Sequence, residues 1–240
     1  MPRCLLLPLL LIACGEEPGA TPADLRLAPP APGWGALFWR EGVAYQRGGG
    51  DVVVGPKGIA TLQRSEVAGA CGAKVEGAPV AAVLAPPIGA TVEPPPDPPA
   101  VANTVVEAAV ARAAELLPPP DPYTPAGPNP DPTKEAGVQV GSVVKARRVG
   151  APPILIVSAL RDCTGLIAIL EADARTVLDH RQIPGLCTLP RALAPADLDG
   201  DGARETALFN AERVVLFRLD EAAGRAKLVA LGDWSCPLTP

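Results

Sequence analysis

The stretch Ala36–Arg47, with the sequence ALFWREGVAYQR, decides the fold class because the chain repeats it without gaps. Residues Ala207–Arg218 read ALFNAERVVLFR, and the two segments are identical at positions one, two, three, six, eight and twelve. Each segment has two apolar runs around a polar turn, which is typical of a β-hairpin. Self-similar hairpins predict a domain built from repeated β units.

Two more copies extend the predicted repeat. Ile154–Ala159 and Leu166–Leu170 form the third copy, and a weaker fourth starts at Val80–Leu84 and resumes at Val138–Val149. About four hairpin units are what a small propeller needs, because each unit buries its apolar face only against its neighbours. The sequence therefore predicts a mainly β, propeller-like domain. A β-sandwich with one insertion is the alternative fold.

The insertion is predicted at residues 86–135, inside the fourth copy. Residues 86–99 and 118–132 are dense in proline, which excludes paired strands and helix interiors there. Between them, apolar residues recur at helical spacing and predict one helix packed on its own domain, or a partner-binding helix on a stalk as the alternative. The apolar positions of this helix are Val101, Val105, Val106, Ala109, Val110, Ala113, Leu116 and Leu117.

The N-terminus has the pattern of an export signal. Met1–Arg3 carries one positive charge, residues 4–12 are apolar, and small Ala13 precedes Cys14. The apolar run is roughly half the 18 or so residues that a membrane span needs. Residues 11–15, LIACG, resemble the lipobox of bacterial lipoproteins, which implies removal of residues 1–13 and a lipid on Cys14. An ordinary secretory peptide or a soluble start is the alternative.

This resemblance also predicts where the protein resides. Gly15 after the cysteine is similar to the pattern that permits sorting to the outer membrane, so we expect a lipid-anchored protein of the cell envelope. Residues 14–32 are rich in Pro, Ala and Glu and predict a flexible spacer. Residues 33–240 then form a single β-repeat domain.

Composition limits the core and the partners. The chain has 240 residues, of which 48% are hydrophobic but only 3% aromatic, so Ala, Val and Leu must build the core. The net charge is −5, and no segment concentrates basic residues. This balance argues against nucleic acid or an anionic membrane surface as the partner of the folded domain.

The leader and the lipid account for two of the six cysteines. The remaining Cys71, Cys163, Cys187 and Cys236 are an even number in an exported chain, which predicts two disulfides with three possible connectivities. If the units close in a ring, the first and last meet, which favours Cys71 with Cys236 and leaves Cys163 with Cys187 inside one unit.

One loop has the pattern of a metal site. Asp197, Asp199, Asp201 and Glu205 occupy positions one, three, five and nine of the sequence DLDGDGARE. Together with the carbonyl of Ala203, they offer the hard oxygens that Ca²⁺ prefers. The loop is not an EF-hand, because position twelve is apolar and strands are predicted on either side. A solvated turn without metal is the alternative.

The loop resembles the calcium loops of FG-GAP and VCBS repeats, the units of integrin-type β-propellers. The resemblance implies a structural Ca²⁺ ion in residues 190–220. The segment before the third copy, Gly150–Pro153, has no acidic residue, so the resemblance supports one calcium site and not a regular seven-bladed propeller.

No catalytic motif accompanies these features. The one histidine, His180, lies in a polar segment, and no Gly-x-Ser-x-Gly sequence occurs. We therefore expect a non-enzymatic module that binds an envelope protein or polysaccharide, or serves as a structural spacer. The alternative is an accessory enzyme or carbohydrate-binding module with a site between units, which a polar pocket near His180 or Trp39 would favour.

Overall fold

The structure, a computed structural model, describes residues 31–40, 43–50, 52–55, 58–61, 84–119, 137–221 and 225–235. Within these residues the chain is mainly β, with one helix and three antiparallel sheets. The first sheet, in the order β2-β1-β5-β3-β4, contains β1 (Gly35–Arg40), β2 (Val43–Gly48), β3 (Val52–Gly55), β4 (Gly58–Thr61) and β5 (Leu84–Ala85).

Helix α1 (Asn103–Leu116) precedes the other two sheets, whose strands follow one another in chain order. The second sheet contains β6 (Gln139–Arg148), β7 (Ala151–Arg161), β8 (Thr164–Glu171) and β9 (Val177–Pro184). The third contains β10 (Arg191–Ala192), β11 (Arg204–Phe209), β12 (Arg213–Asp220) and β13 (Lys227–Ser235).

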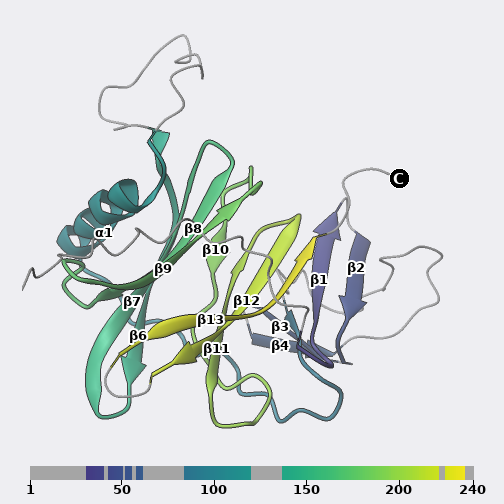
Figure 1. Ribbon diagram of the computed structural model, residues 1–240. Helices are drawn as coiled ribbons and strands as arrows, with labels where there is room; N and C mark the ends of the chain where they lie inside the picture. Colours follow the sequence, from purple (N-terminus) through teal and green to yellow (C-terminus); the bar gives the residue numbers. More distant parts are fainter. Residues whose placement is uncertain are drawn as a thin grey trace, which may run out of the picture.

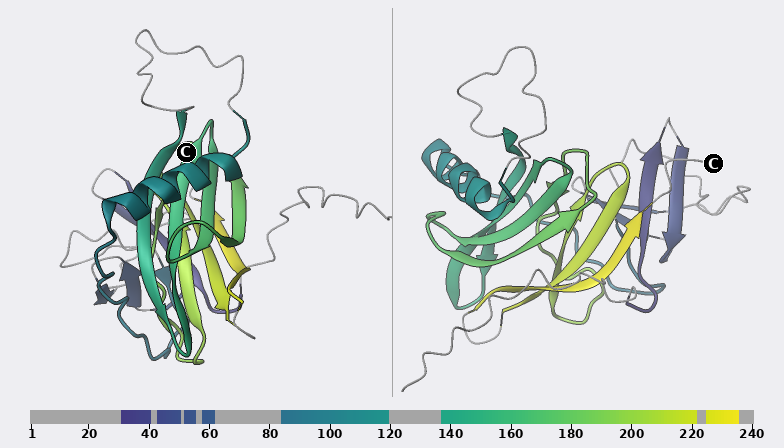
Figure 2. Two further views of the ribbon diagram at one scale, coloured as in Figure 1. Left: turned by 90° about the vertical axis from the view of Figure 1, so that its left-hand side faces the viewer. Right: turned by 45° about the horizontal axis from the view of Figure 1, so that its top comes forward.

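The helix and the three sheets lie face to face as a stack (Figure 1). One apolar cluster joins α1 to the second sheet, a second joins the second sheet to the third, and a third joins the third sheet to the first. Figure 2 shows α1 lying across the strands of the second sheet. The predicted packing of this helix on its own domain is therefore confirmed.

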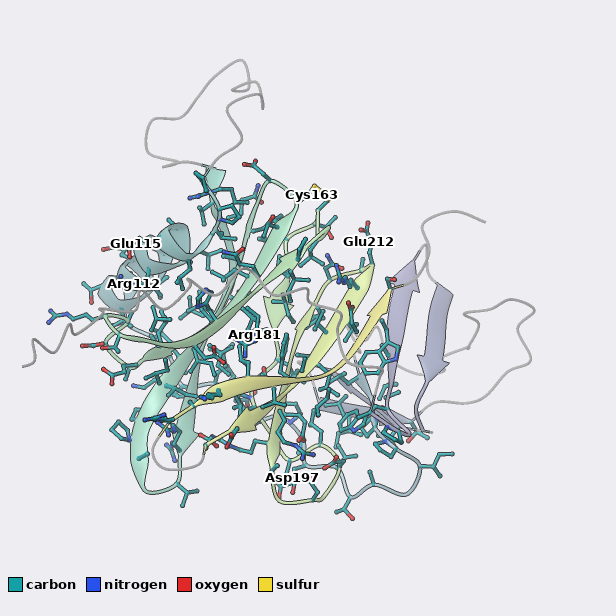
Figure 3. All side chains as sticks on the ribbon, viewed as in Figure 1. Arg112, Glu115, Cys163, Arg181, Asp197 and Glu212 are labelled. Carbon is teal, nitrogen blue, oxygen red and sulfur yellow. A yellow bond between two sulfur atoms is a disulfide. The ribbon has the colours of Figure 1, made fainter. Side chains whose placement is uncertain are left out.

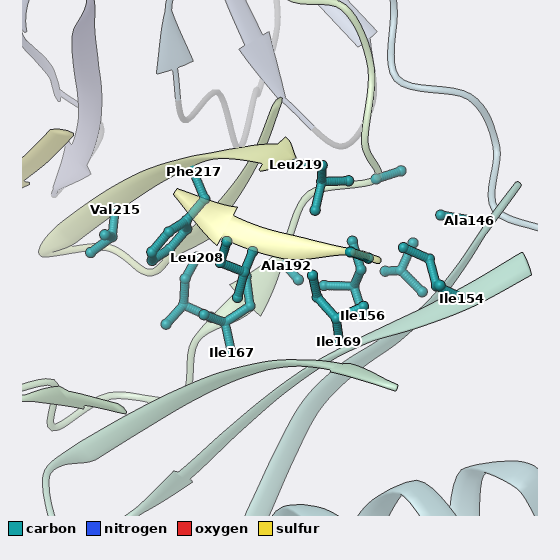
Figure 4. Close-up of a cluster of buried hydrophobic side chains, with 14 of the residues drawn as sticks. Ala146, Ile154, Ile156, Ile167, Ile169, Ala192, Leu208, Val215, Phe217 and Leu219 are labelled. Carbon is teal, nitrogen blue, oxygen red and sulfur yellow. The ribbon is translucent and has the colours of Figure 1, made fainter. Parts of the chain in front are cut away.

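Burial on both faces explains the unbroken apolar runs in the strands. Along β12, Val215 and Phe217 pack toward the second sheet, whereas Val214 and Leu216 pack toward the first. The same alternation holds in β7 and β8, where α1 covers one face. Figure 4 shows Phe217 among aliphatic side chains of the second and third sheets, in a core with few aromatic residues.

The predicted fourth unit is wrong, because its two halves belong to different sheets. Leu84 lies in β5, in the middle of the first sheet, whereas residues 139–148 form β6 at the edge of the second. The described residues contain three sheets, and the proline-rich segment with α1 connects two of them.

A hydrogen bond from the Ala31 amide to the Leu231 carbonyl oxygen (2.7 Å) joins the first described residue to the third sheet.

The two copies of the repeat are both hairpins, but their registers differ. Ala36 pairs with Arg47 in the β1–β2 hairpin, whereas the aligned Ala207 pairs with Leu216 in β11–β12. Asn210 causes this difference, because its side-chain oxygen accepts hydrogen bonds from the amides of Glu212 and Arg213, both 2.8 Å. These bonds fix the turn one residue earlier than in the first copy.

Polar side chains join the second and third sheets where β6 meets β10. The Ser142 hydroxyl accepts a hydrogen bond from the Ala192 amide (2.8 Å), and the Ser158 hydroxyl donates one to the Pro190 carbonyl oxygen (3.0 Å). Glycine is required at position 141, because a Cβ there would overlap the Pro190 carbonyl oxygen. The close approach of the two sheets therefore depends on these small residues.

A disulfide joins Cys163 and Cys187, the internal pair expected from the sequence (Figure 3). Asp162 and Cys163 form the β7–β8 turn with φ of 44° and 58°, as two-residue hairpin turns require. Cys187 follows β9, so the bond stays within the second sheet. The other expected pair, Cys71 and Cys236, lies outside the described residues.

Candidate metal site

The acidic loop connects β10 to β11 in the third sheet, and Figure 3 shows Asp197 at the end of the sheet away from the disulfide. A pair of backbone hydrogen bonds closes the loop. The Glu205 amide donates to the Ala196 carbonyl oxygen at 2.8 Å, and the Ala196 amide donates to the Glu205 carbonyl oxygen at 3.2 Å. The loop therefore starts and ends at fixed positions of the sheet.

Inside the loop, aspartate side chains fold the backbone around themselves. The two carboxylate oxygens of Asp197 accept hydrogen bonds from the amides of Gly200 (2.8 Å) and Gly202 (3.0 Å). Both glycines have positive φ, 79° and 85°, which other residues rarely adopt. The alternation of aspartate and glycine thus determines the shape of the loop.

Three of the predicted ligands converge. One carboxylate oxygen from each of Asp197, Asp199 and Glu205 lies within 4.8 Å of the others. Glu205 is fully buried, and one of its oxygens accepts a hydrogen bond from the Leu198 amide at 3.1 Å. A buried carboxylate beside two others is unfavourable unless positive charge balances it.

Asp201 lies outside this cluster of three carboxylates and pairs with Arg218. The Ala203 amide donates a hydrogen bond to the Asp201 carboxylate at 2.8 Å. A guanidinium nitrogen of Arg218 lies 2.6 Å from Asp201 and 3.9 Å from Asp199, and another lies 3.4 Å from Glu205. Arg218 is therefore a site residue that the sequence reasoning missed.

The register of β11 and β12 could have revealed Arg218. Glu205 and Arg218 are direct cross-strand partners in this hairpin. Opposite charges at such positions face each other on one side of the sheet. The turn at Asn210 sets this strand pairing, so Arg218 could be predicted from the turn and not from the acidic motif itself.

The electrostatics of the cluster favour a cation. Burial raises the pKa of Glu205 from 4.5 to about 7, and the negative charge of Asp199 adds to the rise. Burial also raises the pKa of Asp199, and Asp201 and Asp197 contribute to this increase. Arg218 lowers both pKa values, so one guanidinium only partly balances the carboxylates.

These residues fit a hard divalent cation. The donors are all oxygens, they converge from three positions of one short loop, and one of them is buried. Asp197 keeps acceptor capacity beyond its two bonds to backbone amides, because each carboxylate oxygen has two lone pairs. The fit is to the ion class that includes Ca²⁺ and Mg²⁺.

His180 is the remaining candidate residue whose side chain is described. His180 lies half-buried in β9, and its backbone amide donates to the Asp179 carboxylate at 2.8 Å. It lines neither of two cavities, of about 720 Å³ and about 350 Å³, found among the described residues. Cys14 and the side chain of Trp39 lie outside the described part of the structure.

Comparisons of the chain with protein-family models, with curated proteins and with solved structures gave no match.

Proposed function

We propose that this protein is a calcium-stabilised β-repeat module of the bacterial cell envelope, held at a membrane by a lipid on Cys14. Its domain binds an envelope protein or polysaccharide, or serves as a structural module, and it is not an enzyme. The convergence of Asp197, Asp199 and Glu205 is the observation that supports this proposal most directly.

Calcium is the proposed ion because the loop brings several carboxylates close together. Ca²⁺ accepts six to eight such ligands, whereas Mg²⁺ requires a stricter octahedron and keeps several waters. Asp197, Asp199 and Glu205 would hold the ion, with Asp201 and the Ala203 carbonyl as the further ligands predicted from the sequence. The ion supplies positive charge to carboxylates that otherwise repel one another.

The expected role of the ion is structural, because the loop contacts the segment that leads to α1. The Glu93 amide donates a hydrogen bond to the Asp197 carbonyl oxygen at 3.0 Å, and a Cβ at Gly200 would lie 3.2 Å from the Thr91 carbonyl oxygen. An ion that fixes the loop also fixes this contact between the third sheet and the linker.

The lining of the larger cavity favours binding over catalysis. It lies between the β6–β7 turn and the strands β11 and β12, and therefore between two of the sheets. Its lining contains arginine, acidic and apolar residues, but no hydroxyl, thiol or imidazole group. This cavity thus offers no nucleophile with an adjacent histidine base, which argues against an accessory hydrolase with its site there.

The test is calcium titration of the purified mature chain, followed by thermal unfolding. We expect the midpoint to rise, because a ligand that binds only the folded state stabilises it by about 1.4 kcal/mol at ten times its dissociation constant. Glu205→Gln should abolish the rise. Glu107→Gln removes the same charge from an exposed position on α1 and should leave the rise unchanged. No shift of the wild type at millimolar calcium would overturn the proposal.

A further inference from the structure

The larger cavity, of about 720 Å³, is lined by three arginines from three strands. Arg148 ends β6, Arg204 begins β11, and Arg218 lies in β12. Gly202 and Ala203 of the acidic loop line the same cavity. An arginine cluster and the candidate metal site are therefore direct neighbours.

Arg148 and Arg204 share a single carboxylate. Glu221 accepts a hydrogen bond from Arg148 at 3.1 Å with one oxygen, and bonds from Arg204 at 3.0 Å and 2.6 Å with the other. The side chain of Arg148 is only 6% exposed, so it is held in the wall of the cavity. Because Asp220 also lines the cavity, Arg148 and Arg204 face two carboxylates, and any excess positive charge there depends on Arg218.

Arg218 belongs to both sites. It lines the cavity, yet it also pairs with Asp201 and lies near Glu205 and Asp199. A cation held by Asp199 and Glu205 would bring a second positive charge to two carboxylates that Arg218 already approaches, at 3.9 Å and 3.4 Å. Cation and guanidinium therefore compete, and binding of the cation makes the charge of Arg218 available to the cavity.

We infer that this cavity binds an oxyanion, such as a sulfate, phosphate or carboxylate group, and that a divalent cation in the acidic loop strengthens the binding through Arg218. The inference rests on the proposed calcium site. Without the cation, the carboxylates of the loop neutralise Arg218 and repel an anion. With the cation, three arginines face the two cavity carboxylates Asp220 and Glu221.

The experiment is calorimetric titration of the mature chain with sulfate, and in a separate arm with acetate, at constant ionic strength. Each titration is run without calcium and at saturating calcium. We expect calcium to tighten anion binding about tenfold, a coupling within the usual range for linked sites. The reverse titration must give the same factor, because coupling between two binding equilibria is reciprocal. The two arms distinguish a tetrahedral dianion from a carboxylate.

Two variants separate coupling from general damage. Arg218→Gln should tighten calcium binding and weaken sulfate binding, which are opposite effects that a merely unfolded or loosened protein does not show. Glu221→Gln removes the carboxylate that occupies Arg148 and Arg204, so it should tighten sulfate binding. Arg175→Gln removes an exposed arginine in the β8–β9 turn, with the same change in charge, and should change neither affinity.

The outcomes are distinguishable from those of the proposed function. Calcium binding without any anion binding in either arm overturns the inference and leaves the calcium site intact. Anion binding that calcium does not change, or that Arg218→Gln does not weaken, overturns the coupling. Absence of calcium binding overturns both the calcium site and this inference. Sulfate or acetate binding with reciprocal coupling and opposite effects of Arg218→Gln supports it.

Discussion

At the scale of single residues, burial of Glu205 makes the stability of the calcium-free protein depend on pH. Its pKa is raised from 4.5 to about 7 in the folded state, so folding favours the protonated form. The stabilisation is fully present below the unfolded pKa and is lost as the pH rises through the folded pKa. Asp199, whose pKa is also raised, acts in the same direction.

We therefore expect the free energy of unfolding without calcium to fall by about 2 to 3 kcal/mol between about pH 4 and about pH 8. Denaturant unfolding in a chelating buffer measures this. In Glu205→Gln the decrease should be much smaller, because the amide does not titrate. An equally steep decrease in the variant would show that other groups cause the dependence.

Part of the candidate site could be predicted from the sequence, and part could not. The spacing of Asp197, Asp199 and Glu205 was sufficient to predict that their carboxylates lie close together. The reason is that the loop folds through local hydrogen bonds between aspartate oxygens and glycine amides. The position of Arg218 opposite Glu205 is a property of strand register. A shift of two residues in that register, as in the first hairpin, would place another residue opposite Glu205.

At the scale of elements, one side chain from a strand holds the C-terminal end of α1. Arg161, at the end of β7, is 5% exposed and donates hydrogen bonds to the carbonyl oxygens of Pro118 (2.6 Å) and Ala114 (3.3 Å). The last turn of α1 contains no basic residue of its own. Arg161 thus provides the positive charge that stabilises the C-terminal end of a helix.

Replacing Arg161 by methionine keeps an unbranched side chain but removes both hydrogen bonds. We expect a loss of about 2 kcal/mol, since hydrogen bonds from a charged donor contribute about 1.5 to 3 kcal/mol. Amide hydrogen exchange should accelerate in Asn103–Leu116 more than in β11 and β12. Arg191→Met, at an exposed position of β10, is the control and should leave exchange in α1 unchanged. Equal acceleration in both variants would contradict this role.

The existence of α1 and of the hairpins follows from periodicity, but the assignment of strands to sheets does not. The incorrect fourth unit, which combined Leu84 with β6, was predicted only from the alternation of apolar residues along the chain. Leu84 pairs with Ala36 and Val54 through backbone hydrogen bonds that any alternating segment could make. Long-range pairing of this kind is decided by packing between layers.

At the scale of the whole molecule, the proposed anchor is separable from the folded domain. None of the helices in the described ranges is long and apolar enough to cross a membrane. In the proposed arrangement, Cys14 carries the lipid and residues 14–32 form the spacer before the domain.

We expect Cys14→Ser to remove lipid labelling and to move the protein from the membrane fraction to the soluble fraction of cells. Fractionation after metabolic labelling with a fatty acid measures both effects. Cys4→Ser makes the same substitution within the apolar run and should keep label and fractionation unchanged. A Cys14→Ser protein that still carries label would contradict lipidation at this residue.

The position of the third sheet also sets the order in which the protein folds. This middle layer is synthesised after the other two sheets, since it begins at Arg191, whereas the first sheet ends at Ala85 and the second at Pro184. Among the described residues, no apolar cluster contains side chains of both the first and the second sheet, and each of these sheets packs on the third. A nascent chain that ends before Arg191 therefore exposes two uncovered apolar faces, and only the last strands bring them into one core.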